Sequence, residues 1–328
     1  MRACIAGWGT AVPEGRLTNH DLEQRVETSD DWIVERTGIR ERRIAAPAET
    51  TASLAIEAGT AAIKQAGITP DEVDLLIVAT ATPEQPIPHT GAFVGDGLGL
   101  NCGSFDLAAG CAGFVYELVT GAALLTSGNL RHVLVIGAET LSRIVDPTDR
   151  GTCILFGDGA AAVVLEPGDD ESTGLLAWDL GCDGSATGLL EIPAGGSRLP
   201  TTSATIAEGQ QFIKMQGQEV FRRAVRAVVN SAKSALDRAG VAAADVDHFV
   251  PHQANLRIIE AAADRLEIPS GRTVVNIDQY GNTSAASIPL ALAEAADSGR
   301  IVDGDLVLLS GFGAGMTWGS AVLRWGRA

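Results

Sequence analysis

In Ala66-Gly67-Ile68-Thr69-Pro70-Asp71-Glu72-Val73-Asp74-Leu75-Leu76-Ile77-Val78, a helix-like run ends and a continuous apolar run begins, which is typical of a buried β-strand. The second half of the chain repeats this pattern in Ala239-Gly240-Val241-Ala242-Ala243-Ala244-Asp245-Val246-Asp247-His248-Phe249-Val250-Pro251. Aligning Asp74 with Asp247 sets the two stretches 173 residues apart (247 − 74). A helix, a turn and a strand that recur in this way indicate an internal repeat, in which the two halves of the chain share one fold.

The same offset relates further elements of the two halves. It carries Cys111 to position 284, where the helix-like run 284–290 begins, and it sets residues 133–137 against residues 306–310. Strand-like and helix-like runs alternate throughout, which predicts an α/β protein with buried central strands.

We therefore expect two similar halves that pack face to face. The first half covers residues 1–165 and the second covers residues 173–328, with the acidic, turn-rich segment 166–172 between them. Because ligands of α/β folds bind beyond the strand ends, we expect the functional site between the halves.

Composition sets limits on the function. A chain of 328 residues with 46% hydrophobic content can build one large domain or two ordinary ones. The net charge of −17 argues against nucleic acid or an anionic membrane as a general partner. No segment predicts a signal peptide or a membrane span. Five scattered cysteines predict neither a disulfide framework nor a zinc site, so we expect a cytoplasmic protein.

Cys111 is the candidate nucleophile. It lies in the run 105–114, where a short strand turns through small residues into an apolar helix. The amides and dipole at a helix N-terminus stabilise a thiolate, so we expect a lowered pKa for Cys111. A lone buried cysteine is more often a small core residue, and Cys111 alone does not decide between the two.

Two polar residues of the second half are candidate partners for Cys111. His252 follows the buried strand of residues 248–251, at a strand end. Asn282 lies in the turn 281–287, which the repeat makes the counterpart of the Cys111 turn. Taken singly, a histidine is more often structural, and an asparagine in a turn is commonly a helix cap.

The glycine-rich segment 311–320 superficially resembles a dinucleotide loop. A strand-like run follows it, however, so the helix N-terminus that would hold a pyrophosphate is missing. We expect a turn that offers backbone amides to an oxyanion, with a plain hairpin as the alternative.

Taken together, four motifs make the chain resemble the β-ketoacyl-acyl carrier protein synthase III family of the thiolase-like superfamily. The motifs are residues 108–114, 251–259, 281–289 and 311–320, and the resemblance runs nearly end to end. It implies an α/β thiolase-like fold, with two similar halves in αβαβα layers and an internal pseudo-twofold repeat. It also implies a homodimer and no metal. It implies no cofactor either, because the CoA thioesters are substrates.

The family's reaction is a decarboxylative Claisen condensation of an acyl-CoA primer with malonyl-acyl carrier protein. The resemblance makes Cys111 the acylated nucleophile and gives the backbone amides of Cys111 and Ala314 the role of an oxyanion hole. His252 and Asn282 are then the donors to the enolate that forms when carbon dioxide leaves. The products are 3-oxoacyl-acyl carrier protein, CoA and carbon dioxide.

Three further groups of residues follow from the resemblance. The predicted CoA site comprises Thr28, Trp32, Arg150, Gly217 and Asn255. The predicted carrier-protein patch, an exception on an acidic chain, comprises Arg36, Arg222 and Arg257. The predicted acyl pocket comprises Ile87, Leu141, Phe156 and Leu190, with Ile87 reaching into the neighbouring subunit. Isoleucine at position 87 predicts short primers, from acetyl to about butyryl or branched equivalents.

Two alternative functions remain. The chain could be a starter-unit synthase or acyltransferase of secondary metabolism within the same family, which would differ only in its second substrate. It could also be a noncatalytic acyl-binding protein on the same fold, a reading that the complete triad disfavours.

Overall fold

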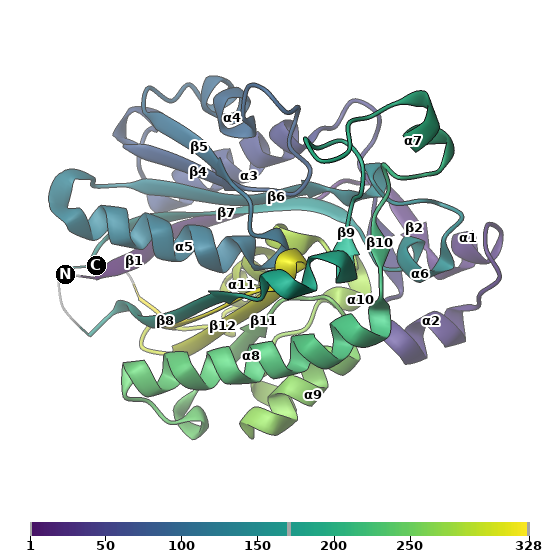
Figure 1. The fold of residues 1–328 in the computed structure, drawn as a ribbon. Helices are drawn as coiled ribbons and strands as arrows, with labels where there is room; N and C mark the ends of the chain where they lie inside the picture. The colour runs from purple at the N-terminus through teal and green to yellow at the C-terminus, as the bar shows by residue number, and fades with distance from the viewer. Residues whose placement is uncertain (1, 169–171, 327–328) are drawn as a thin grey trace.

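The computed structural model describes residues 2–168 and 172–326. Two β-sheets lie one above the other with helices between and outside them (Figure 1). The turn predicted over 166–172 lies partly outside the described residues, because 169–171 are not among them.

The first sheet is formed by the first half of the chain and has the strand order β1-β7-β6-β4-β5. Its strands are β1 (Ala3–Ala11), β4 (Leu75–Ala79), β5 (Gly103–Leu107), β6 (Val133–Thr140) and β7 (Asp158–Pro167). Strand β4 pairs in parallel with β5 and β6, whereas β7 is antiparallel to both β6 and β1. Every residue of β6 is buried, as expected for a central strand.

The second sheet has the order β11-β12-β13-β8. Its strands are β8 (Gly174–Cys182), β11 (His248–Pro251), β12 (Leu306–Gly313) and β13 (Thr317–Arg324). One parallel pair, β11 with β12, is followed by two antiparallel pairs, which is the pattern of β4-β6-β7-β1 in the first sheet. The predicted internal repeat is therefore confirmed.

Helices complete a layered αβαβα arrangement (Figure 1). Helices α3 (Thr51–Ala66) and α4 (Thr90–Leu98) cover the outer face of the first sheet, and α8 (Gly217–Ala239) and α9 (Leu256–Leu266) cover that of the second. Helices α5 (Gly113–Leu124) and α11 (Ser287–Asp297) lie between the sheets, where they share one apolar core with both.

The remaining elements are short. The other helices are α1 (Asn19–Glu23), α2 (Asp30–Thr37), α6 (Arg150–Cys153), α7 (Ser203–Ala207) and α10 (Ile277–Tyr280). Two small sheets pair β2 (Arg16–Thr18) with β3 (Glu41–Arg43) and β9 (Leu190–Glu191) with β10 (Lys214–Met215). Short helical turns are η1 (Pro70–Glu72), η2 (Gly110–Ala112), η3 (Leu125–Asn129), η4 (Leu141–Arg143), η5 (Gly184–Leu189), η6 (Ala243–Asp245), η7 (Ser270–Arg272), η8 (Ser284–Ala286) and η9 (Ala314–Met316).

The repeated helix-to-strand turns have the same local geometry. Gly67 ends α3 and Gly240 ends α8, each in the left-handed conformation, with φ of 76° and 69°. In both cases the glycine amide donates to carbonyls of the last helical turn, which satisfies groups that the helix leaves unpaired. Strands β4 and β11 then begin at Leu75 and His248, 173 residues apart (248 − 75) as predicted.

The predicted register is wrong by one residue at the turns that precede α5 and α11. The left-handed residues that open these turns are Gly110, with φ of 54°, and Ser284, with φ of 49°. They lie 174 residues apart (284 − 110), so Cys111 corresponds to Ala285 rather than to Ser284. One extra residue in the connection between β11 and η8 accounts for the shift.

The sequence expectation for the helix after Cys111 also needs two corrections. The run Gly110–Asn129 is long and apolar enough to cross a membrane by length and composition, contrary to the expectation that no segment is. Most of it is buried between the two sheets, however, as befits a core helix. The helix is also less apolar than expected, because the buried residue Glu117 lies within it.

Candidate active site

Cys111 lies where the two halves of the chain touch. It is the middle residue of η2, between β5 and α5. Gly313 of β12 packs so closely on this turn that a Cβ there would lie 2.4 Å from the Cys111 amide nitrogen. In the first half, Gly137 of β6 packs equally closely on the Ala285 carbonyl oxygen. Each turn is therefore held against a glycine on a central strand of the opposite half.

The two amides predicted to form the oxyanion hole come from turns in contact. Ala314 begins η9 directly after β12, and a Cβ on Gly110 would lie 2.9 Å from the Ala314 nitrogen. The Thr317 hydroxyl donates to the Ala109 carbonyl oxygen at 2.7 Å and so ties the two turns together. Their relative position is fixed by backbone packing, which is what a preorganised anion site needs.

Asn282 is oriented by its own neighbours. Its backbone amide donates to the Leu155 carbonyl at 2.8 Å, and its carbonyl accepts from the Gly157 amide at 2.9 Å. Its side-chain Oδ1 accepts from the Ser284 amide at 2.8 Å. Because Oδ1 is engaged in this way, the Nδ2 amino group remains as the donor that the side chain offers to the cavity.

His252 follows β11, as predicted, and it is buried. Its backbone amide donates to the Ser310 carbonyl at 2.8 Å, and its ring meets Phe312 edge-on, with 5.4 Å between ring centroids. Ring atom Nδ1 lies 2.6 Å from the Ser287 hydroxyl oxygen. The other nitrogen, Nε2, has no hydrogen-bond partner among the described residues.

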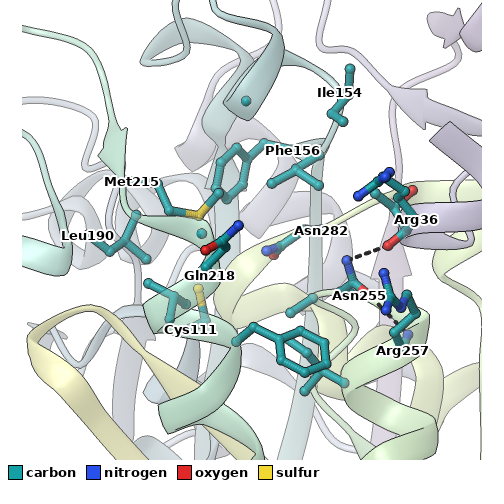
Figure 2. A pocket seen from close by; sticks show the side chains of 18 of the residues that line it. Arg36, Cys111, Ile154, Phe156, Leu190, Met215, Gln218, Asn255, Arg257 and Asn282 are labelled. Atoms are coloured by element: carbon teal, nitrogen blue, oxygen red, sulfur yellow. Dashed lines mark hydrogen bonds between the residues drawn. The ribbon is translucent and has the colours of Figure 1, made fainter. Parts of the chain in front are cut away.

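A cavity of about 530 Å³ brings most of the predicted site residues together. Those lining it are Trp32, Arg36, Cys111, Phe156, Leu190, Gly217, Arg222, His252, Asn255, Arg257 and Asn282. Figure 2 shows Arg36, Asn255 and Arg257 grouped on one side, with Cys111 and Asn282 further in. Sequence reasoning missed Met215, Gln218 and Phe221, which also line the cavity and belong to no motif.

Trp32 lies on α2 between two guanidinium groups. The Arg36 and Arg150 groups lie 5.1 Å and 4.9 Å from the ring centroid, within cation–π range. Arg150 also donates to the Glu27 carbonyl at 2.9 Å, next to Thr28. Thr28 and Arg150 do not line the cavity, but the buried Thr28 hydroxyl has no hydrogen-bond partner among the described residues.

Asn255 joins the Trp32 helix to the second half. Its Nδ2 donates to the Arg36 carbonyl at 3.0 Å, and its Oδ1 caps α9 by accepting from the Arg257 amide at 2.9 Å. This contact holds α2 and α9 together at the cavity, where the predicted CoA and carrier-protein residues meet.

A second, largely apolar cavity of about 220 Å³ also reaches Cys111. The predicted acyl-pocket residues Leu141, Phe156 and Leu190 line it. The sequence did not point to four further lining residues, Ala81, Ile144, Ile192 and Ile213. Ile87 lines neither cavity of its own chain and is 84% exposed, so its role in a neighbouring subunit stays a prediction.

The expected lowering of the Cys111 pKa is wrong. Burial raises the pKa of this thiol to about 12, and the nearby carboxyl of Glu139 adds to the effect, although a hydrogen bond with Ser284 offsets part of it. Burial also lowers the pKa of His252 to about 3. Both groups are therefore neutral at pH 7, because removing either one from water penalises its charged form more than the helix end compensates.

Two similar α/β halves, with a cysteine from one and a histidine and an asparagine from the other, define a condensing enzyme of thiolase-like fold. Models of the 3-oxoacyl-[acyl-carrier-protein] synthase III family match residues 105–184, and those of its C-terminal part match residues 236–325. The chain is 52% identical to β-ketoacyl-[acyl-carrier-protein] synthase III of Roseiflexus castenholzii and 51% identical to that of Desulfitobacterium hafniense, over 98% of each chain.

A solved structure agrees with these sequence matches. The chain superposes on β-ketoacyl-[acyl carrier protein] synthase III of Thermus thermophilus with a TM-score of 0.92 and 45% identity, covering 99% of this chain and 100% of that one. The chain belongs to the β-ketoacyl-acyl carrier protein synthase III family.

Proposed function

We propose that this enzyme condenses an acyl-CoA primer with malonyl-acyl carrier protein, the reaction that initiates fatty acid synthesis, through an acyl thioester on Cys111. The observation that carries the proposal is the convergence of Cys111, His252 and Asn282 on one cavity that extends to Trp32. Splitting one carbon–carbon bond formation into two steps at a covalent intermediate lowers each barrier.

In the first step, the Cys111 sulfur attacks the thioester carbonyl of the acyl-CoA. The carbon–sulfur bond to CoA breaks, and the thiol proton of Cys111 leaves with the CoA thiol. The amides of Cys111 and Ala314 are the proposed donors to the tetrahedral oxyanion. A buried neutral thiol supports a step in which attack and proton loss are coupled.

In the second step, malonyl-acyl carrier protein loses carbon dioxide. The electron pair of the broken carbon–carbon bond forms an enolate, whose oxygen receives hydrogen bonds from His252 Nε2 and Asn282 Nδ2. The enolate carbon attacks the acyl carbonyl on Cys111, the Cys111 sulfur leaves and takes up a proton from solvent, and 3-oxoacyl-acyl carrier protein is released. Two neutral donors suit this step because they stabilise charge only as it develops.

The release of carbon dioxide tests the proposal. With carboxyl-labelled malonyl-acyl carrier protein, label should leave as carbon dioxide in proportion to the 3-oxoacyl product. Asn282→Ala should slow this release by about 10²–10³-fold, because one enolate donor is lost, and leave the Cys111 adduct intact. An acyltransferase of secondary metabolism would instead move the acyl group to an alcohol or amine without releasing label.

The Trp32 side chain is the proposed stacking partner of the CoA adenine. Trp32→Ala should raise the KM for acyl-CoA by about 10-fold or more with little change in kcat, because stacking on an aromatic ring contributes about 1–3 kcal/mol per base. Steady-state kinetics with acyl-CoA varied measure this change. Trp178→Ala, at an exposed position on β8, is the matched control. A KM that both variants leave unchanged would remove Trp32 from the CoA site.

Several features support the remaining parts of the proposal. Arg36, Arg222 and Arg257 line the same cavity as Trp32, which suits an acidic carrier protein. The isoleucine-lined second cavity suits a short or branched primer. No disulfide joins cysteines within the described residues, which suits a reducing compartment such as the cytoplasm.

We also propose that the enzyme is a homodimer, in which each subunit consists of the two similar halves. Strand β5 is the edge of the first sheet, where it offers unpaired backbone groups, and Ile87 protrudes from the neighbouring loop.

Strand β7 ends in the first sheet at Pro167 and β8 begins in the second at Gly174, which supports halves at residues 1–165 and 173–328.

A further inference from the structure

The two ring nitrogens of His252 have different surroundings. Nδ1 points to the Ser287 hydroxyl oxygen at 2.6 Å, a short hydrogen bond between two buried groups. Nε2 has no partner among the described residues, although the side chain lines the same cavity as Cys111 and Asn282. The side of the ring that faces Ser287 is thus fixed, and the other side is free for substrate.

The hydrogen bonds of Ser287 decide which atom donates. Its hydroxyl oxygen has two close polar neighbours, His252 Nδ1 and the Gln253 amide, whose nitrogen lies 3.3 Å away. The Gln253 amide can only donate, so it occupies an acceptor position on the oxygen. If Nδ1 also donated, the Ser287 hydroxyl proton would have no acceptor, because the described residues offer this hydroxyl no other hydrogen bond. The hydroxyl proton therefore goes to Nδ1.

We propose that Ser287 is a positioning residue that holds His252 in the tautomer with its proton on Nε2. The proposal rests on the proposed function and deepens it, since it states why His252 can donate to the enolate oxygen. Ser287 is well placed for this role because it is the first residue of α11, a helix buried between the two sheets. The edge contact with Phe312 restrains the ring from a second direction.

This tautomer gives His252 a role in only one of the two steps. A neutral imidazole whose Nδ1 accepts a hydrogen bond carries its single proton on Nε2, so Nε2 donates and cannot accept the Cys111 proton. His252 then serves the decarboxylation and has no role as the base for Cys111 acylation. Loss of the Ser287 hydroxyl should consequently affect the two half-reactions unequally.

The kinetic test uses Ser287→Ala in the full-length enzyme and measures the half-reactions separately. Carbon dioxide release from malonyl-acyl carrier protein should fall by about 10-fold or more, in line with the effects of mispositioned histidines elsewhere. The rate of Cys111 acylation from acetyl-CoA, followed by intact-protein mass spectrometry, should change by less than about 2-fold. Ser231→Ala removes an equally buried serine hydroxyl on α8 and should change neither rate.

A spectroscopic test reads the tautomer directly. Nitrogen-15 NMR is recorded on wild-type enzyme labelled in its five histidines, and the His252 signals are assigned by their absence in His252→Gln. In the wild type, His252 should carry a proton on Nε2 and none on Nδ1. Ser287→Ala should show a mixture of tautomers. A proton on Nδ1 in the wild type would overturn the proposal, as would equal slowing of both half-reactions in the variant. Because the NMR arm uses the wild type, it decides the matter even if the variant does not fold. If the proposed function fails, wild-type Cys111 takes no acyl group from acetyl-CoA, whatever the tautomer.

Discussion

Cys111→Ala should reduce the formation of 3-oxoacyl product by about 10⁵–10⁶-fold, the scale at which removal of a nucleophile acts in other enzymes. The loss is expected to be this large because no covalent intermediate can form and the cavity has no second cysteine among its described lining residues. Product formation from acetyl-CoA and malonyl-acyl carrier protein, followed by mass spectrometry of the carrier protein, measures the effect.

Cys153→Ala is the matched control for this experiment. Cys153 is also a buried free cysteine, but it packs in the apolar cluster around Ile33 and Ile154 and lines neither cavity that reaches Cys111. Its replacement should leave the acyl adduct and the turnover in place. Substantial condensation by Cys111→Ala, or an acyl group on Cys153 in the wild type, would contradict the assignment of the nucleophile.

Glu117→Leu should raise the free energy of unfolding by roughly 1–3 kcal/mol, because it removes a carboxyl group from the core between the sheets. Neither carboxyl oxygen of Glu117 makes a hydrogen bond of good geometry with another described residue, although the amides of Ala79 and Ile136 lie close enough to offset part of the cost. Denaturant unfolding at pH 7, followed by circular dichroism, measures the difference. Glu57→Leu, at an exposed position on α3, should produce no comparable gain.

The stability difference at Glu117 should also depend on pH. Burial raises the pKa of this carboxyl well above its ordinary value of 4.5, so the folded state keeps a proton that the unfolded chain releases. The wild type should therefore lose about 1.4 kcal/mol for each pH unit above 4.5 until the folded-state carboxyl itself ionises. Glu117→Gln should remove this part of the slope. A variant whose pH dependence matches the wild type would show that Glu117 is not protonated in the core.

Local sequence patterns predicted the fold well because they report backbone geometry. A glycine after a helix-like run is typical of a left-handed helix end, and both Gly67 and Gly240 have that conformation. The predicted register of the repeat was wrong by one residue at the Cys111 turn because a single insertion in a loop leaves no periodic signal. Ser284 has the left-handed conformation that a glycine usually marks, so its turn could not be located from the sequence.

The site was predicted less completely because much of it depends on burial. The four motifs contain Cys111, His252 and Asn282, which line the main cavity, but not Met215, Gln218 or Phe221. The protonation of Cys111 follows from its burial, which the position at a helix end does not reveal. Ser287 resembles any helix-start serine until its distance to His252 is known. Ile144 and Ile213 reach the second cavity from segments that lie far apart in the sequence, so neither carries a motif.

A pulse-chase experiment on wild-type enzyme tests whether Cys111 carries the acyl group through the condensation. Enzyme acylated with carbonyl-labelled acetyl-CoA is separated from free CoA, mapped by peptide mass spectrometry and then mixed with malonyl-acyl carrier protein. We expect label on Cys111 that moves to carbon 3 of the 3-oxoacyl-acyl carrier protein as an equal amount of carbon dioxide is released. Label on another residue, or label that stays on Cys111 while carbon dioxide and product form, would contradict it.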